Sequence, residues 1–462
     1  MTIKLSDKLL ADQFRKDPRV RQAKNLLLQA LQDAQKGITG VKAPQSDLQQ
    51  TYREIIEEFN KIRGGKLYYP YLGSGFGKGV FVELLDGSIK YDMINGIGVH
   101  YWGHSHPEIL ANSIDASLND TVMQGHLQQN YNAANISKIL IEASGLDHCF
   151  LSSSGAMANE NALKIIFQKK FPAHRILAFE KCFIGRSLAL SQITDKPSFR
   201  EGLPSNVFVD YIPFYDPAHP TESTQQAIDA LKDCIERHPK EYAVFCFELI
   251  QGEGGFHAGT HEFFTALMQI ARDHGIAVFI DEVQTFGRTS ELFAFQHFKL
   301  QDFADVVTLG KLSHVCATLF KNEYKPKPGL LSQTFTSSTS ALQVGQFIIE
   351  QLIHGDYFGH KGKINTVHAK FEMRFRQLEK KHPELIAGPY GTGSMIVFTP
   401  LKGNHDKVLK FVQDLFEAGV ISFVAGSEPT RVRFLVPIGT IEDHDIEAVM
   451  DILEQVLTKD KK

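Results

Sequence analysis

The sequence contains little cysteine, no long apolar segment and no excess of positive charge. Its five cysteines among 462 residues are well separated and form no Cys-x-x-Cys pair, which excludes a disulfide framework and argues against a zinc site. No run approaches the roughly 18 apolar residues of a membrane-spanning helix. The formal net charge of −4 offers nothing to attract nucleic acid. The first seven residues, 1–7, contain no apolar core of the signal-peptide kind, so we expect a cytoplasmic protein.

The composition is typical of a folded globular protein with a large hydrophobic core. Of its residues, 43% are hydrophobic and 22% are charged, and the length predicts two or three structural units. Residues 1–65 have helical patterns over 20–35 and 49–62. Alternating residues from 80 to 92 around Asp86-Gly87 predict a β-hairpin.

From about residue 145 short apolar strands alternate with amphipathic helices. This rhythm predicts βαβ units, and therefore an α/β protein with a mainly parallel sheet covered by helices. The last hundred or so residues read as a smaller α/β domain. The predicted strands are 149–151, 175–179, 207–212, 243–249, 277–281 and 306–309.

Three polar features follow the ends of these strands, where ligands bind in an open parallel sheet. Ser154-Gly155-Ala156 opens a helix whose free N–H groups suit a phosphate, although simple capping is the commoner use of such residues. Asp281 ends an apolar strand, and an acid there needs a cationic or donating partner. Lys311 directly follows the next strand, where a desolvated amine becomes a nucleophile for carbonyls. Together they fit a phosphorylated pyridine aldehyde, with the lysine as imine partner and the acid on the ring nitrogen.

Over residues 65–455 the sequence resembles the class III (ω-amino group) aminotransferases, which use pyridoxal 5'-phosphate and have fold type I. The matching stretches occur in the family's order and are Tyr91–Val99, Gly103–Pro107, Ser154–Lys164, Phe183–Arg186, Glu248–Gly255, Asp281–Gln284, Thr308–Lys311 and Arg433–Pro437. The resemblance implies a large domain with a seven-stranded, mostly parallel sheet and a smaller α/β domain. We predict a helical arm at 1–65, a small-domain segment at 66–110, the cofactor-binding domain at 111–340 and the C-terminal small domain at 341–462.

The resemblance also assigns roles to residues around the cofactor. Lys311 would form the imine with it and later carry the proton, and Asp281 would pair with its ring nitrogen. Gln284 would donate to the ring oxygen, and Phe183 would stack on the ring. The phosphate would lie on the N–H groups of Gly155 and Ala156, at the helix start capped by Ser154.

Other implied residues bind substrate or come from a second subunit. Arg433 would take the α-carboxylate of a 2-oxo acid, Arg186 would take the distal carboxylate, and Glu253 would mask Arg433 while an amine donor is bound. Thr334 would reach the phosphate of the neighbouring subunit, which implies a homodimer with shared active sites, although the flanking residues depart from the family pattern.

The implied reaction moves a terminal amino group from an ω-amino or diamino acid to 2-oxoglutarate by a ping-pong cycle. The donor stays open among lysine, ornithine or acetylornithine, and 4-aminobutyrate. Residues 155–164 favour the lysine branch, whereas Ile97 in the pocket is typical of 4-aminobutyrate enzymes. One alternative is an aminomutase or decarboxylase on the same fold. The other is a non-catalytic binding module, and the presence of Lys311 argues against it.

Two further segments resemble a phosphate-binding loop and a metal site. Residues 73–79 resemble a phosphate loop, but Gly79 follows Lys78 where serine or threonine belongs. His104 and His106 stand two residues apart in a loop with no obvious third ligand, so we expect no metal there.

Overall fold

The structure is a computed structural model that describes residues 9–459, so the segment 1–7, where no signal peptide is predicted, lies outside the described residues. The chain forms two compact units. The large unit comprises residues 115–365 and 391–393, and the small unit comprises residues 9–114, 366–390 and 394–459. The predicted boundary at 340 falls at the start of helix α12 (Thr339–His354), which the structure keeps within the large unit.

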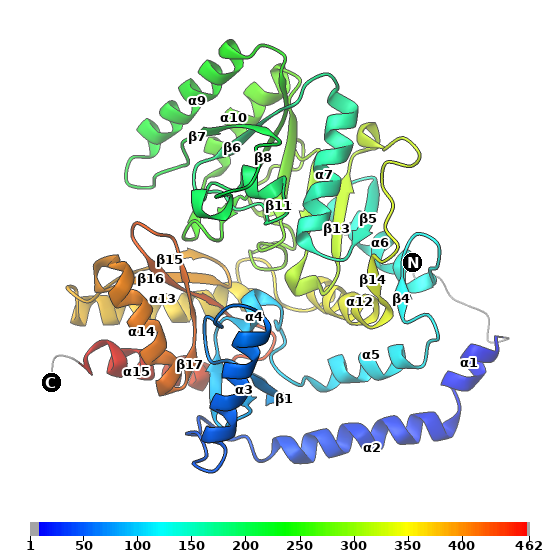
Figure 1. The fold of residues 1–462 in the computed structure, drawn as a ribbon, viewed down its shortest axis with the longest axis vertical. Coiled ribbons are helices and arrows are strands. Elements are labelled where there is room, and N and C mark those ends of the chain that lie inside the picture. The colour runs from blue at the N-terminus through cyan, green and yellow to red at the C-terminus, as the bar shows by residue number, and fades with distance from the viewer. Residues whose placement is uncertain (1–8, 460–462) are drawn as a thin grey trace. The chain divides into compact units, whose positions relative to one another are not determined.

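The large unit is built on a seven-stranded sheet, as predicted (Figure 1). Its strands, in spatial order, are β5 (His148–Ser152), β13 (Cys316–Phe320), β12 (Val306–Leu309), β11 (Ala277–Glu282), β8 (Tyr242–Phe247), β6 (Arg175–Phe179) and β7 (Phe208–Ile212). Strand β13 runs antiparallel to both of its neighbours, and the pairs from β12 to β7 are parallel. All six strands expected from the sequence are present, and β13 is the one that the sequence analysis missed.

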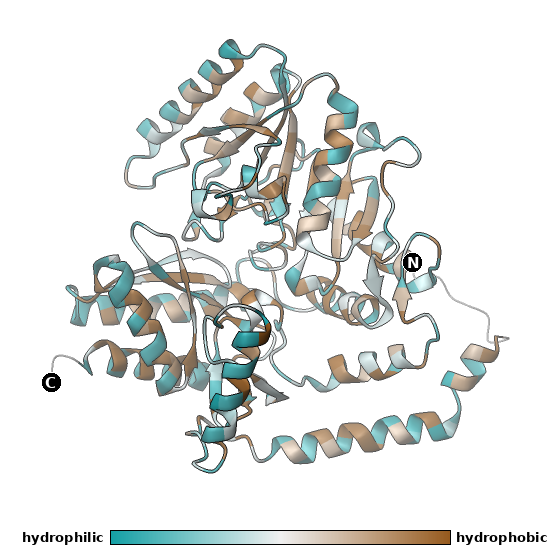
Figure 2. Ribbon diagram, in the orientation of Figure 1, coloured by the Kyte–Doolittle hydropathy of each residue, from teal (hydrophilic) through white to brown (hydrophobic). Residues whose placement is uncertain are grey.

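Helices cover this sheet and bury its apolar strands. Helix α7 packs on β5, β8, β12 and β13, α10 packs on β11, and α9 packs on β7 and α10. Figure 2 shows mainly hydrophobic strands and helices that carry both hydrophobic and hydrophilic residues, the pattern of elements buried on one side. The helices of the large unit are α6 (Tyr131–Ser144), α7 (Gly155–Lys170), α8 (Leu190–Ile193), η1 (Pro197–Phe199), α9 (Pro220–Arg237), α10 (His261–Asp273), α11 (Ala294–His297), η2 (Lys311–Ser313), η3 (Asn322–Tyr324) and α12.

Local signals in the sequence set several of these helix ends. The Ser154 hydroxyl accepts a hydrogen bond from the Met157 N–H at the start of α7, and the Thr260 hydroxyl accepts one from Phe263 N–H at the start of α10. Gly145 ends α6 with a φ of 73°, a left-handed conformation that suits glycine. Two short ladders complete the unit, β9 (Ile250–Gln251) with β10 (His257–Ala258) and β4 (Met123–Gln124) with β14 (Ser337–Ser338).

The small unit contains two four-stranded sheets. The first has the order β1 (Gly73–Lys78), β2 (Phe81–Leu84), β3 (Ile89–Asp92) and β17 (Val420–Ile421), and the second has β15 (Ile386–Thr392), β16 (Met395–Pro400), β19 (Arg431–Leu435) and β18 (Phe423–Ala425). The predicted hairpin is β2–β3, with Gly87 at a φ of 75° in its turn. The segment that resembles a phosphate loop forms strand β1, which pairs with β2 and opens no helix.

Helices of the N-terminal and C-terminal parts complete the small unit, and both predicted N-terminal helices are present as α2 and α3. They are α1 (Leu10–Arg15), α2 (Pro18–Gln35), α3 (Gln49–Ile62), α4 (Asn95–Gly98), η4 (Leu401–Gly403), α14 (His405–Ala418) and α15 (Asp443–Leu457). The chain passes between units within α5 (Pro107–Ser117) and α13 (Lys363–Lys381). No helix between residues 9 and 459 has the length and apolar character needed to cross a membrane.

Candidate active site

Lys311 lies two residues beyond the end of β12 and begins the short helix η2. Its backbone has a φ of 54°, in the left-handed region that residues other than glycine seldom adopt. Such strain persists only where the surrounding structure enforces it, and it is commonly found at functional sites. The residue is half-buried.

Asp281 lies on β11, opposite Thr308 in the register of the parallel pair β11–β12. Parallel strands end at the same sheet edge, and the carboxyl end of β11 therefore brings Asp281 to the edge from which Lys311 emerges. The carboxylate is 6% exposed and accepts hydrogen bonds from Val283 N–H at 2.8 Å and from the Asn159 amide at 2.7 Å. Burial raises its pKa to about 6, although the two donors and the charge of Lys311 oppose the rise.

The start of α7 meets the segment that follows Asp281. A Cβ added at Gly155 would lie 2.8 Å from Cγ1 of Val283, so only glycine lets the backbone come this close. The Ser154 hydroxyl caps the helix through Met157 N–H. The first N–H groups of a helix have no partner within it, so those of Gly155 and Ala156 are available to an anion.

Gln284 and Phe183 are held near Glu248, which ends the β8 region. Glu248 accepts hydrogen bonds from Phe183 N–H and Gly252 N–H, both at 2.9 Å. Burial and the negative charge of Asp281 raise the pKa of Glu248 to about 8. A Cβ at Gly252 would lie 2.2 Å from the Gln284 amide oxygen, which is buried and has no hydrogen-bond partner among residues 9–459.

Three further predicted residues lie in loops of the large unit. The exposed Arg186 stacks its guanidinium 3.6 Å from the ring centroid of Phe199, and Glu253 is half-buried in the turn that Gly252 begins. Thr334 is exposed, and its carbonyl lies so close to Gly125 that a Cβ there would approach it to 1.8 Å.

The remaining two predicted residues belong to the small unit. Arg433 is buried on β19 with its guanidinium 5.4 Å from the ring centroid of Phe423. Ile97 lies in α4 with a φ of 60°, a strained value for a β-branched residue. Neither residue therefore belongs to the unit that carries Lys311 and Asp281.

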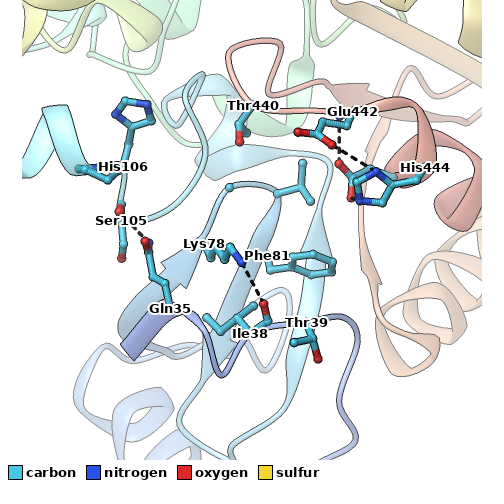
Figure 3. Close-up of a pocket in the computed structure, with 14 residues that line it drawn as sticks. Gln35, Ile38, Thr39, Lys78, Phe81, Ser105, His106, Thr440, Glu442 and His444 are labelled. Carbon is cyan, nitrogen blue, oxygen red and sulfur yellow. Dashed lines mark hydrogen bonds and ion pairs between the residues drawn. The ribbon is translucent and has the colours of Figure 1, made fainter. Parts of the chain in front are cut away.

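The small unit also contains a cavity of about 580 Å³ that none of the predicted site residues lines (Figure 3). Lys78 points toward the carbonyl of Ile38 there, and the Gln35 amide donates to the Ser105 carbonyl at 2.9 Å. His106 lines this cavity, whereas the His104 ring pairs with the Asp92 carboxylate at 2.9 Å. Within the described part of the chain, no cluster of three or more His, Cys, Asp or Glu side chains could hold a metal ion.

Two residues that the sequence analysis assigned no role contact the site directly. Asn159 bonds to Asp281, and Glu248 bonds to the Phe183 segment. Both lie inside the stretches that match the family. Their place inside these matching stretches was the available signal in the sequence.

Comparisons with known proteins identify the family. The model of the class-III aminotransferases matches residues 75–457. An acetylornithine aminotransferase of Methanocaldococcus jannaschii is 30% identical over 404 residues, which cover 84% of this chain and 93% of that protein.

Solved structures share the fold. A lysine aminotransferase from M. tuberculosis has a TM-score of 0.76 at 22% identity and covers 87% of this chain and 99% of its own. An ornithine aminotransferase from Toxoplasma gondii has a TM-score of 0.76 at 21% identity and covers 88% of this chain and 95% of its own. These matches confirm the predicted fold type I.

The residues at the sheet edge fit pyridoxal phosphate, the cofactor of this family. Gly155 forms a close backbone approach that any Cβ would fill, and a buried carboxylate lies at the sheet edge that carries a half-buried lysine. A helix start that can bind an anion, together with an acid and a lysine at the same sheet edge, is what a phosphorylated, protonated pyridine aldehyde requires. The chain is a pyridoxal-phosphate-dependent enzyme that belongs to the class-III aminotransferases.

Proposed function

We propose that the enzyme transfers the terminal amino group of an ω-amino or diamino acid to 2-oxoglutarate by a ping-pong mechanism. The observation that carries the proposal is the arrangement of Lys311 and Asp281 at the ends of adjacent strands, in a chain whose matched relative is named for acetylornithine. The names of the structural neighbours, lysine and ornithine aminotransferase, are those of diamino acids. We therefore place acetylornithine, ornithine and lysine before 4-aminobutyrate among the donors.

In this proposal each residue of the large unit has one task toward the cofactor. When bound, pyridoxal phosphate supplies an aldehyde that takes up the amino group and a cationic ring that accepts the electrons of a breaking C–H bond. Lys311 Nζ holds the aldehyde and then moves the proton of that bond. Asp281 keeps the ring nitrogen protonated, because an adjacent anion stabilises a cation in a buried site.

Other groups orient the cofactor or complete its site. The N–H groups of Gly155 and Ala156, in the turn that Ser154 caps, bind the phosphate. The Gln284 amide bonds to the ring oxygen, and the Phe183 ring covers one face. Thr334, which is exposed in this chain, contributes its hydroxyl to the phosphate of a second copy, so the proposal includes a homodimer.

Substrate recognition would rest on two guanidinium groups and one carboxylate. Arg433 binds the α-carboxylate of the 2-oxo acid, Arg186 binds the distal carboxylate, and Glu253 pairs with Arg433 while the amine donor is bound. A guanidinium fork matches a carboxylate with two parallel hydrogen bonds. Ile97 would line the pocket and contribute to donor choice.

The Arg433→Ala variant tests the substrate part of this proposal. We expect kcat/KM for the 2-oxo acid half-reaction to fall about 100-fold or more, because a charge-assisted bidentate contact is lost, and the amine half-reaction to fall much less. Stopped-flow absorbance of the cofactor follows each half-reaction separately. Arg431→Ala is the matched control, since Arg431 lies two residues away on β19 and also stacks on an aromatic ring, Tyr390. Equal losses in the two half-reactions of Arg433→Ala would exclude a switching clamp.

A screen of donors tests the reaction class itself. The amine half-reaction is expected with acetylornithine, ornithine or lysine, followed by regeneration with 2-oxoglutarate. Turnover without any added 2-oxo acid would instead indicate a mutase, and release of CO₂ would indicate a decarboxylase.

The pH dependence of cofactor binding should report the ionisation of Asp281. Below its pKa of about 6 the carboxyl group becomes neutral and loses its attraction for the ring cation, so we expect the affinity of the apoprotein for pyridoxal phosphate to fall as pH falls through about 6. The Asp281→Asn variant corrects for titration of the cofactor's own phosphate and should lack this decline. Equilibrium titration by absorbance measures both proteins, and superimposable profiles would contradict the pairing.

A further inference from the structure

Asn159 is a buried side chain of α7 whose hydrogen-bonding groups are all engaged. It is 2% exposed. Its amide nitrogen donates to Oδ2 of Asp281 at 2.7 Å and to the carbonyl of Ile184 at 2.6 Å, and its amide oxygen accepts from the hydroxyl of Thr308 at 2.6 Å. An asparagine amide offers two N–H donors and an accepting oxygen, so both donors and the oxygen are used.

The partners fix which way the amide faces. The Ile184 carbonyl can only accept a hydrogen bond, so the NH₂ side must face it, while the Thr308 hydroxyl donates to the other side. Turning the amide over would set its oxygen against the carbonyl oxygen and leave these buried groups without suitable partners. The orientation is therefore determined by more than one contact.

These three bonds join the segments that carry the proposed cofactor contacts. Asn159 lies one helical turn after Gly155 on α7, Ile184 follows Phe183, and Thr308 precedes Lys311 by three residues on β12. Asp281 provides the fourth segment, β11. Phe183 is held a second time, since its N–H donates to Glu248 at 2.9 Å.

We propose that Asn159 is a positioning residue for the cofactor: its single amide orients the Asp281 carboxylate and at the same time fixes the backbone beside Phe183. The inference rests on the proposed role of Asp281 and extends it to a residue that does not touch the cofactor. A donor aimed at Oδ2 stabilises the ionised carboxylate, the form needed opposite a ring cation. The second donor holds the loop that carries the stacking ring.

The charges around Asp281 make this donor important. Lys311 and the Val283 N–H favour the ionised form, whereas burial disfavours it. The carboxyl groups of Glu248 and Glu282 and the thiols of Cys246 and Cys316 also interact electrostatically with Asp281. Because the Asn159 amide lowers the pKa of Asp281, its removal raises that pKa above the present value of about 6.

The test uses Asn159→Leu, of similar size but without donors, beside Asn161→Leu. Asn161 lies on the same helix, is also 2% exposed and donates to the Ser152 hydroxyl at 3.0 Å, so it matches the loss of a buried amide without touching Asp281. We expect Asn159→Leu to weaken pyridoxal phosphate binding about tenfold or more and to move the acid decline of cofactor affinity to higher pH. Asn161→Leu should retain wild-type affinity and pH profile.

A second substitution, Asn159→Asp, and thermal melting separate a loss of cofactor binding from a loss of folding. Asn159→Asp preserves shape and the Thr308 contact but cannot donate to the Ile184 carbonyl while ionised, and it should shift the pH profile in the same direction. Thermal melting of each apoprotein shows whether it is folded. Wild-type affinity and pH profile in a folded Asn159→Asp or Asn159→Leu protein would overturn the inference, as would equal losses in Asn161→Leu. If Asp281→Asn itself bound the cofactor normally, the proposed site would fail instead.

Discussion

Lys311→Ala is expected to lower kcat by at least about a thousandfold, because in the proposed site this one amine both holds the cofactor aldehyde and moves the substrate proton. The effect should appear in both half-reactions, since each requires that proton to be moved. The variant should also lose the visible absorbance band that the bound cofactor gives in the wild type. Activity assays and absorbance spectra of protein incubated with pyridoxal phosphate measure the two effects.

Lys321→Ala is the matched control for this variant. Lys321 lies at the end of β13 in the same unit, where its amine pairs with the Asp305 carboxylate at 3.0 Å and is partly exposed. A surface ion pair of this kind contributes about 0–1 kcal/mol, so the control should fold and retain activity. Identical spectra of wild type and Lys311→Ala after incubation with cofactor would contradict the assignment.

The sheet and its functional edge could be predicted from the sequence because both depend on local pattern. Apolar runs such as 243–249 mark strands, and the residue that follows a strand must lie at its carboxyl end. This reasoning predicts Asp281 and Lys311 as site residues. Strand β13 was missed because its run, residues 316–320, follows a polar loop closely and pairs antiparallel to β12, outside the βαβ rhythm.

The hydrogen bonds inside the site could not be read from the same patterns. Asn159 and Asn161 are both buried on α7, yet only Asn159 reaches Asp281, because the contact depends on how the helix is rotated against β11 and β12. Glu248 likewise lies near the end of the predicted strand 243–249, but the two hydrogen bonds that it accepts depend on loops that contain Phe183 and Gly252. Such side-chain partners are set by tertiary packing, whereas strand ends are set by the local sequence.

The buried acidic side chains at this sheet edge reduce the stability of the fold, and cofactor binding gives a reason why they are there. Asp281, Glu248 and Glu282 are each buried with a pKa that burial raises. An ionised carboxylate in such a place destabilises the fold unless donors or a cation compensate. In the proposed site the bound cofactor would supply a cation for Asp281, so we infer that cofactor binding would offset part of the free-energy cost of burying this carboxylate.

Asp281→Asn should separate the function of this carboxylate from its effect on folding. We expect kcat to fall about 100- to 1,000-fold, as when a preorganised electrostatic partner of the reacting group is removed. Asparagine has nearly the same shape but carries no charge to keep the ring nitrogen protonated. Single-turnover rates with a reactive donor measure the loss, and Asp305→Asn, at a carboxylate beside the neighbouring strand β12, serves as the control.

The stability of the same variant should change in the opposite direction. The pKa of Asp281 rises on folding from 3.8 to about 6, so folding favours the neutral carboxyl group. Below about pH 4 the group is neutral in both the folded and the unfolded chain and does not change the free energy of unfolding. Above about pH 6 it is ionised in both, and its burial then lowers the free energy of unfolding by the full amount. A rise of this size corresponds to on the order of 3 kcal/mol at about pH 8. The Asp281→Asn substitution relieves that penalty. The amide cannot accept both of the present hydrogen bonds, but losing one of them costs about 1–2 kcal/mol, which is less than the relieved penalty, so the apoprotein should be at least as stable as the wild type at that pH. Denaturant unfolding of both apoproteins measures this. A large loss of stability together with the loss of activity would mean that Asp281 serves the fold rather than the reaction.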